Sequence, residues 1–335
     1  MNIHVNLKEN SYSIYMEDGI LHHIKEYTNL NRKVMIITDD NIPKEYIEII
    51  KKQCLQPFVE VVKAGEQSKS FPTFKTLCSS LLKHNFSRKD CVLALGGGVI
   101  GDLAGYVASS YMRGIDFIQV PTTTLSQIDS SIGGKVAINL DGVKNVIGAF
   151  YQPKAVFIDH QTLATLPPRH FYNGLVEALK AGLIYDAQLF ALFEDEHYLD
   201  HLDEIMYRAL CVKKEVVEID EKEMGLRKIL NFGHTIGHAI ESYYSLSEYY
   251  HGECVSFGML YFVSEDIKKR LLPIYKRMHL PQTPCFNQEE VFRLLTKDKK
   301  ASGNDITIVS VNEIGKAQLE KHSIASIKEV LRYEK

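Results

Sequence analysis

CVLALGGGVIGD, residues 91–102, joins an apolar run typical of a buried strand to a glycine-rich turn and the start of a helix. Glycine lets a backbone approach a phosphate closely, and a helix N-terminus offers N–H donors at the positive end of the helix dipole. The spacing Gly96-x-Gly98-x-x-Gly101 matches the dinucleotide-binding fingerprint. Tight packing of a helix on a strand would need the same glycines, so the motif alone leaves both interpretations open.

The ribose-binding acid of a standard Rossmann domain follows the glycines by about 20 residues. Here that point falls at Val120-Pro121, which offers no acid. An acid instead ends an earlier apolar run, at Asp39, so we predict that Asp39 holds the ribose while the glycine loop holds the phosphates. The loop from Gly65 to Lys69 is placed to assist. Asp39 could equally cap the helix that follows it.

The pattern around the glycine loop alternates strands with helices, which predicts βαβ units and a mostly parallel sheet. We expect a hairpin at Asn2–Leu7 and Tyr12–Met16, strands at Lys33–Thr38, Phe58–Val62, Cys91–Leu95 and Ile115–Val120, and helices at Ile42–Gln53, Phe71–His84 and Val99–Met112. Beyond that half, helical spacing dominates at Pro167–Tyr185, Leu202–Ile219, Phe232–Tyr244, Cys254–Arg270 and Glu289–Thr296. The fold class is therefore an α/β Rossmann-like N-terminal domain, residues 1–160, and a mainly α-helical C-terminal domain, residues 161–335.

Composition excludes several classes of function. A formal net charge of −3 over 335 residues gives no global field for nucleic acid or anionic membranes. No apolar run approaches the roughly 20 residues needed to cross a bilayer, and the first ten residues do not resemble a signal peptide, so we expect a cytoplasmic protein. The six cysteines form no CxxC pair and are expected to be buried, reduced thiols.

A possible metal site lies in NFGHTIGH, residues 231–238. His234 and His238 are four apart and would share one face of a helix. His251 follows, and two imidazoles with one carboxylate form a known catalytic metal set. The pattern is not HExxH, so the zincin protease interpretation lacks its general base. Spacing does not choose the carboxylate, because Glu177, Glu241 and Glu253 all compete.

Polar and basic residues gather outside charge runs, often beside glycines or in apolar surroundings. They are Arg113, Thr122, Thr123, Asp129, Lys135, Lys144 and Asn145, followed later by Lys213, Arg227 and Lys299. Any one of them could be an ordinary surface residue. Together they suit a ligand that carries phosphate and carboxylate groups, which Arg and Lys bind through charge-assisted hydrogen bonds.

With these residues in place, the chain resembles the dehydroquinate synthase family of sugar-phosphate cyclases over almost its whole length. The matching segments occur in order as GEQSK, GGGVIGDLAGYVASSYMRGIDFIQVPTT, QIDSSIGGKVAIN, KNVIGAFYQPKAV, TLATLP, GLVEALKAG, DEKEMGLRKILNFGHTIGHAIE, HGE and DKK. The resemblance implies conversion of 3-deoxy-D-arabino-heptulosonate 7-phosphate to 3-dehydroquinate and phosphate, a shikimate-pathway step toward chorismate and aromatic amino acids. It also implies NAD that is regenerated in each turnover, a divalent metal (Zn²⁺ or Co²⁺), a sugar-phosphate substrate and a homodimer.

The resemblance assigns roles to individual positions. The metal ligands would be Glu177, His234 and His251, which leaves His238 as a polar group of the active site. NAD would contact Asp39, Glu66, Lys69, Gly97, Gly98, Val99, Ile100, Gly101, Asp102, Thr122, Thr123, Asp129, Lys144, Thr162, Leu163, Ala164 and Thr165. The substrate would meet Arg113, Asp129, Lys135, Asn145, Lys180, Lys213, Arg227, Asn231, His238 and Lys299, with Lys300 as the rival of Lys299.

Two alternatives remain from the sequence. Another cyclase, such as 2-deoxy-scyllo-inosose synthase or an aminodehydroquinate synthase, would share NAD and metal but differ in its substrate contacts. An alcohol dehydrogenase of the glycerol dehydrogenase type has a related two-domain plan and would accumulate NADH.

Overall fold

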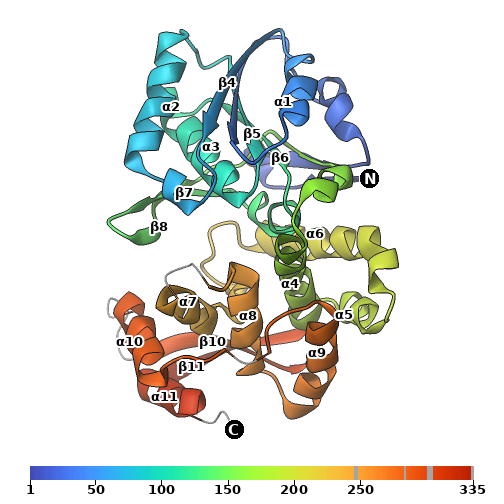
Figure 1. The fold of residues 1–335 in the computed structure, drawn as a ribbon, viewed down its shortest axis with the longest axis vertical. Helices are drawn as coiled ribbons and strands as arrows, with labels where there is room; N and C mark the ends of the chain where they lie inside the picture. The colour runs from blue at the N-terminus through green and yellow to red at the C-terminus, as the bar shows by residue number, and fades with distance from the viewer. Residues whose placement is uncertain (245–247, 283, 300–304, 333–335) are drawn as a thin grey trace. The chain divides into compact units, whose positions relative to one another are not determined.

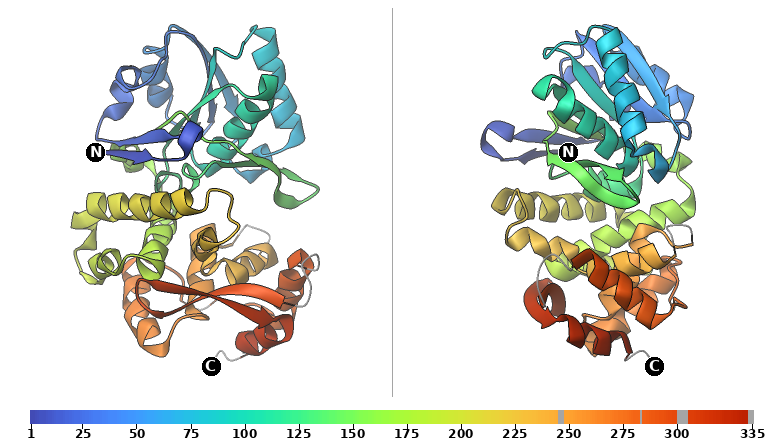
Figure 2. Two further views of the ribbon diagram at one scale, coloured as in Figure 1. Left: turned by 180° about the vertical axis from the view of Figure 1, so that it is seen from behind. Right: turned by 90° about the vertical axis from the view of Figure 1, so that its left-hand side faces the viewer.

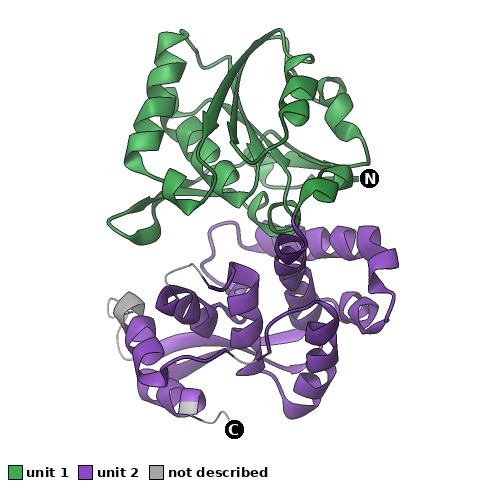
Figure 3. Cartoon of the chain, in the orientation of Figure 1, with its two compact units in different colours: residues 1–166 green, residues 167–335 purple. Residues whose placement is uncertain are grey.

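The computed structural model describes residues 1–244, 248–282, 284–299 and 305–332, without the side chains of 297–299 and 332. The chain divides into two compact units, Met1–Leu166 and Pro167–Lys335 (Figure 3). No helix in the described ranges is both long and apolar enough to cross a membrane.

Unit 1 is built on a seven-stranded sheet of order β1-β2-β9-β6-β5-β3-β4 (Figure 1). Its strands are β1 (Asn2–Val5), β2 (Tyr12–Met16), β3 (Lys33–Asp39), β4 (Gln56–Val62), β5 (Cys91–Gly96), β6 (Asp116–Pro121) and β9 (Ala155–Ile158). Only the β1–β2 pair is antiparallel; the other neighbours run parallel. β5 is buried along its whole length, as the apolar run CVLAL predicts for a strand covered on both faces.

Helices cover both faces of this sheet. Ile47 and Ile50 of α1 (Lys44–Lys51) pack with the core on one face. α2 (Phe71–Lys83) and α3 (Gly98–Ser110) pack with the core on the other. The helices that leave the neighbouring strands β3 and β5 therefore go to opposite faces. Open α/β sheets bind ligands at such a switch point, outside the carboxyl ends of the strands.

A separate hairpin, β7 (Lys135–Leu140) with β8 (Val143–Phe150), carries several of the predicted polar residues. Val136 and Ile138 are buried against α3, whereas most of β8 is exposed. The sequence predicts no strand in this segment.

Unit 2 is mainly helical, with one hairpin that the sequence analysis missed (Figure 2). Its helices are α4 (Pro168–Ile184), α5 (Ala187–Glu194), α6 (Leu202–Ile219), α7 (His234–Tyr243), α8 (His251–Leu260), α9 (Glu265–Arg277), α10 (Gln288–Lys299) and α11 (Ile324–Arg332). The hairpin pairs β10 (Asp305–Glu313) with β11 (Lys316–Ser323). Ile306 and Ile308 pack with apolar residues of α7, α8, α10 and α11 in one core.

Two expectations from the sequence are wrong. The helix predicted at Cys254–Arg270 is two helices, α8 and α9, separated at residues 261–264. The cysteines are all free, as expected, but only Cys91 and Cys254 are buried, and Cys285 is exposed.

Candidate active site

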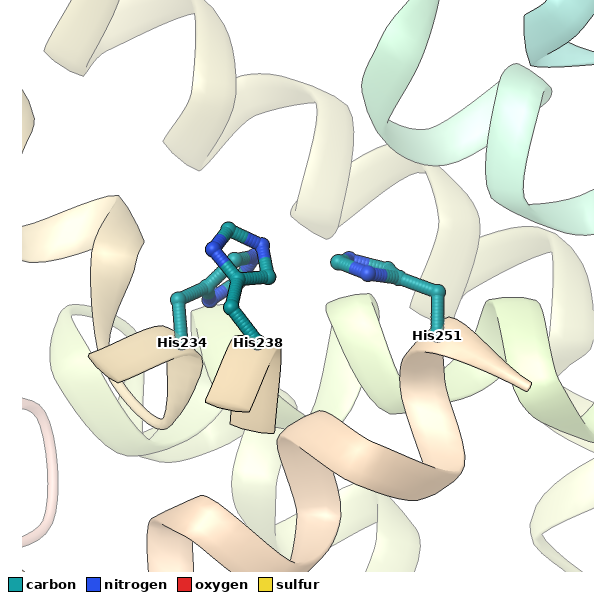
Figure 4. A group of neighbouring side chains, drawn as sticks. All are labelled: His234, His238 and His251. Carbon is teal, nitrogen blue, oxygen red and sulfur yellow. The ribbon is translucent and has the colours of Figure 1, made fainter. Parts of the chain in front are cut away.

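Three histidines of unit 2 form a cluster at the starts of two helices. His234 and His238 lie on α7, and His251 points toward them from the first residue of α8 (Figure 4). One ring nitrogen from each can be chosen so that all three lie within 4.8 Å of one another. The fold thus brings together the residues that spacing alone singled out, at a separation that one metal ion could bridge.

Glu177 of α4 adds a carboxylate to this cluster. Its Oε1 lies 3.8 Å from His234 Nε2 and 3.7 Å from His251 Nε2. Its Oε2 forms an ion pair with Lys180, one turn further along α4. Both carboxylate oxygens are buried and accept no well-formed hydrogen bond within the described residues. Buried polar atoms are normally satisfied, so Oε1 and the two Nε2 atoms suit a metal ion as their shared partner.

The second nitrogen of each of these imidazoles is already engaged. His234 Nδ1 lies 3.0 Å from the carbonyl oxygen of Phe232, and His251 Nδ1 lies 3.4 Å from Glu241 Oε2. A donor at Nδ1 leaves the Nε2 lone pair free to face Glu177. Metal-binding histidines usually show this division between the two ring nitrogens.

The electrostatics favour the ligand forms of Glu177 and His234, and a positive charge at His251. Burial raises the pKa of Glu177, but the Lys180 ammonium and the two imidazoles outweigh it and hold that pKa well below its ordinary value. Burial, aided by Lys180, lowers the pKa of His234 well below its ordinary value. Burial also lowers the pKa of His251, but Glu177 and Glu241 outweigh it and raise that pKa to about 9. The cluster therefore attracts positive charge at His251, which a proton or a metal ion can supply.

The structure distinguishes among the three carboxylates that compete, by spacing alone, to be the metal ligand. Glu253 forms a two-point ion pair with Arg169, with distances of 2.7 and 2.8 Å. Glu241 contacts His251 at Nδ1, the nitrogen that does not face Glu177. Only Glu177 lies near the Nε2 atoms of two histidines. The sequence analysis named Glu241 only as a rival ligand and missed its contact with His251, although Glu241 lies seven residues after His234 on the same helical face.

Glycines let α7 and α8 pack backbone against backbone. A Cβ on Gly258 would lie 1.9 Å from the carbonyl oxygen of Gly233, and one on Gly237 would lie 2.8 Å from that of Cys254. Gly233 also has a φ of +77°, which favours glycine. The glycines of GHTIGH thus let the helix that carries His234 and His238 pack closely against the helix that carries His251.

The other predicted substrate residues of unit 2 have varied surroundings. Lys180 and Arg227 are buried. The backbone around Arg227 is held by Asp220, whose carboxylate accepts the N–H groups of Met224, Gly225 and Arg227. Asn231 Nδ2 donates to Glu223 at 2.6 Å, and His238 is exposed. Lys213 lies half-buried on α6. The side chain of Lys299 and all of Lys300 lie outside the described residues.

Most of the predicted nucleotide residues lie at the carboxyl edge of the unit 1 sheet. The β3–β5 register pairs Ile37 with Ala94, and Asp39 and Gly96, each two residues further along, end these two neighbouring strands. Gly97 and Gly98 follow β5 and begin α3, which continues through Val99, Ile100, Gly101 and Asp102. Thr122, Thr123 and Asp129 follow β6, and the 3-10 helix that contains Thr162, Leu163, Ala164 and Thr165 follows β9. Parallel strands bring all of these segments to one edge.

This edge has features that fit a nucleotide. Thr122 Oγ1 is buried without a hydrogen-bond partner in the part of unit 1 that is described. A Cβ on Gly98 would lie 2.9 Å from Ser130 Oγ, so a side chain there would displace that hydroxyl from the α3 N-terminus. Asp39 Oδ1 accepts the N–H of Asn41 at 2.9 Å, whereas the N-cap of α1 is Pro43. Asp39 therefore does not cap α1, the alternative that the sequence left open.

A polar network links this edge to the β7–β8 hairpin. The buried Lys69 ammonium contacts Asp102 Oδ2 at 2.6 Å and bonds Asn145 Oδ1. Asn139, which the sequence analysis did not single out, donates to Glu66 Oε1 at 2.8 Å. Burial raises the pKa of Asp102, and Lys69 opposes that rise. Lys135 and Lys144 lie exposed on the same hairpin.

Arg113 is not brought to this edge. It precedes β6 by three residues, whereas Thr122 follows the end of β6 directly. The six residues of β6 therefore separate them, about 20 Å at the usual strand rise. Arg113 lies instead in a pocket with Ser87, Arg88 and Lys89.

Comparison with known structures places the fold among the sugar-phosphate cyclases. A 2-deoxy-scyllo-inosose synthase in complex with carbaglucose-6-phosphate, NAD⁺ and Co²⁺ superposes with a TM-score of 0.86 at 25% identity, covering 99% of each chain. A 2-epi-5-epi-valiolone synthase from Streptomyces hygroscopicus subsp. jinggangensis 5008, with NAD⁺ and Zn²⁺ bound, gives a TM-score of 0.86 at 27% identity, covering 98% of this chain and 97% of the other.

Sequence comparison identifies one family among the sugar-phosphate cyclases. Residues 59–173 match the N-terminal model of 3-dehydroquinate synthase, and residues 174–301 match the C-terminal model. A 3-dehydroquinate synthase from Clostridium acetobutylicum is 41% identical, with 95% of this chain and 96% of the relative covered. The chain belongs to the 3-dehydroquinate synthase family.

Proposed function

We propose that the protein converts 3-deoxy-D-arabino-heptulosonate 7-phosphate to 3-dehydroquinate and phosphate, with NAD and a divalent metal as cofactors. The observation that carries this proposal is the set of Glu177, His234 and His251 around one point in a member of this family. The proposal keeps the cytoplasm as the compartment, as the sequence predicts, and a homodimer as the assembly, as the family resemblance implies.

Glu177 Oε1 and the Nε2 atoms of His234 and His251 would hold the metal. A bound zinc or cobalt ion supplies Lewis acidity toward the hydroxyls of the substrate. Glu241 keeps His251 oriented from the opposite side of its ring. Lys180 keeps Glu177 ionised, because its ammonium is paired with Oε2.

The carboxyl edge of unit 1 would hold NAD, with Asp39 on a ribose and the start of α3 on the phosphates. Bound NAD supplies reversible hydride transfer. The substrate contacts proposed are Lys135, Asn145, Lys180, Lys213, Arg227, Asn231, His238 and Lys299. The cations among them suit phosphate and carboxylate, and His238 could move a proton. Arg113, which precedes β6 and lies away from the carboxyl edge of its own chain, stays a proposed substrate contact, as the family resemblance implies.

A phosphate-release assay tests the proposal. The purified protein with NAD and Co²⁺ should release phosphate from the heptulosonate phosphate over many turnovers without net NADH, and a chelator should stop the reaction. Stoichiometric NADH would favour the dehydrogenase alternative. A stable substrate in the presence of both cofactors would favour another sugar-phosphate cyclase, such as the structurally similar inosose synthase.

Asp39→Ala should weaken NAD binding and leave metal content unchanged. Loss of a hydrogen bond made by a charged group costs about 1.5–3 kcal/mol, or about 10- to 150-fold in affinity. Asp40→Ala is a matched control, since the neighbouring Asp40 carboxylate bonds Lys63 and the N–H of Ala64. Calorimetric titration with NAD measures both variants. Equal affinities would remove Asp39 from the ribose.

A further inference from the structure

The N-terminal half of α4 contacts the start of α8 through three successive pairs. Arg169, Asn173 and Glu177 are spaced by four residues, so they form one row along a helix. Opposite them lie Glu253, Gly252 and His251, in reverse order of sequence. Arg169 pairs with Glu253, Asn173 with Gly252, and Glu177 with His251.

The outer pair is built from side chains. Arg169 Nε and its terminal nitrogen Nη2 contact the two oxygens of Glu253 at 2.7 and 2.8 Å, and Nη2 also donates to the carbonyl of Glu248 at 2.6 Å. The carboxylate of Glu253 is almost fully buried, with 5% of its side chain exposed. A buried carboxylate that lost Arg169 would be left without its countercharge.

The middle pair is a backbone contact. Asn173 Oδ1 accepts the N–H of Gly252 at 2.6 Å in the interior. A Cβ on Gly252 would lie 2.1 Å from the carbonyl oxygen of Asn173, so the helices touch here. Any side chain at 252 would separate them.

Together these pairs fix the residues on either side of His251. Glu253 Oε2 accepts the N–H of Tyr250 at 2.8 Å, and Asn173 holds the N–H of Gly252. The Tyr250 ring contacts two side chains of α4, the Arg169 guanidinium at 4.3 Å and the stacked His170 ring at 4.5 Å. The backbone of His251 is therefore held on both sides from the helix that carries Glu177.

We propose that Arg169, Asn173 and Glu253 are positioning residues of the metal centre, because they set the register of α4 against the start of α8 and so the distance between Glu177 and His251. None of the three needs to touch metal or substrate. The proposal rests on the metal role of Glu177 and His251 proposed above.

The test compares two ion pairs of matched geometry. Arg270 and Glu194 form a second two-point pair at 2.7 and 2.8 Å, with the guanidinium 5.1 Å from the Phe190 ring. Arg169 and Arg270 are equally exposed, with 49% of each side chain accessible. The Arg270 pair joins α9 to α5, neither of which carries a candidate ligand. Arg270→Gln thus controls for the loss of a two-point pair from an equally exposed arginine, with the difference that the Glu194 side chain is 35% exposed and that of Glu253 is 5% exposed.

Co²⁺ binding to the metal-free protein and the visible spectrum of bound Co²⁺ are the readouts. Arg169→Gln and Asn173→Ala should each lower Co²⁺ affinity about 10- to 100-fold and change the spectrum, as changes to residues that support metal ligands do. Arg169→Lys should lie between Arg169→Gln and the unchanged protein, and Arg270→Gln should match the unchanged protein. All variants should keep the far-ultraviolet circular dichroism of the unchanged protein.

Equal Co²⁺ affinity and identical spectra for Arg169→Gln and Arg270→Gln would overturn the positioning role. Failure of the unchanged protein to bind Co²⁺ would contradict the metal centre itself, which is a different result. If Arg169→Gln did not fold, Arg169→Lys and Asn173→Ala would carry the test, and unchanged metal binding in both would overturn it.

Discussion

Alanine at Glu177, His234 or His251 is expected to give a folded protein that binds zinc or cobalt more than about 100-fold more weakly and has almost no turnover. Loss of residues that merely support metal ligands costs about 10- to 100-fold, and loss of a ligand removes a direct bond as well. Glu177 Oε1 lies within 3.8 Å of both imidazole Nε2 atoms, so each of the three residues contributes one donor to a common point.

His238→Ala serves as the comparison in this experiment. His238 belongs to the same cluster, but it is exposed, and the family resemblance leaves it outside the ligand set. We expect the variant to keep its metal and lose turnover, through poorer substrate positioning or proton transfer. Metal analysis of the four purified variants, with turnover measured in added Co²⁺, decides the assignment. A metal-free His238→Ala beside a loaded Glu177→Ala would mean that the ligand set is wrong.

The sequence predicts six of the seven strands of the unit 1 sheet because their signals are local, but it predicts no strand at β9 (Ala155–Ile158). The glycine loop follows a strand and begins a helix, and alternating strands and helices leave a parallel sheet as the simple arrangement. Asp39 is predicted as the ribose-binding acid because the usual position, about 20 residues after the glycines, holds no acid. Asp39 lies near the glycine loop because β3 is the neighbour of β5 in the sheet, and the sequence does not give this strand order.

Long-range contacts explain the errors in unit 2. The apolar run after Cys254 continues through Tyr261, Phe262 and Val263, so no local signal stops the helix before Ser264. The break arises because Val311 of β10 bonds the backbone of Phe262 and of Ser264. All eight residues of β11 are exposed or half-buried, which leaves little alternation for a strand prediction.

The sequence predicts only part of the metal site, because some of its features depend on contacts between distant segments. The spacing of His234 and His238 is visible in the sequence, but the choice among three carboxylates depends on how α4 meets α7 and α8. The resemblance to the family assigns Glu177 as the carboxylate ligand. Geometry gives a physical reason, because Glu253 is paired with Arg169 and Glu241 contacts Nδ1 of His251, the nitrogen that does not face Glu177.

Gly258→Ala is expected to reduce metal binding by separating the two helices that carry the histidines. The added Cβ would lie 1.9 Å from the carbonyl oxygen of Gly233 and 2.9 Å from the N atom of Gly237, and both are backbone atoms that cannot rotate away. Overpacking a well-packed interior costs about 1–3 kcal/mol in the free energy of unfolding. We expect at least that cost, together with a shift of α7 that carries His234 away from Glu177.

Gly105→Ala separates the loss of stability from the loss of the site. Gly105 lies in α3 of unit 1, where a Cβ would meet the Val136 side chain at 2.3 Å. This variant should be destabilised yet keep the Co²⁺ affinity of the unchanged protein, since none of its neighbours carries a proposed ligand. Thermal unfolding and Co²⁺ titration of both variants give the comparison. If Gly258→Ala bound Co²⁺ as tightly as Gly105→Ala, close packing of α7 on α8 would not be what holds His234 and His251 at the metal.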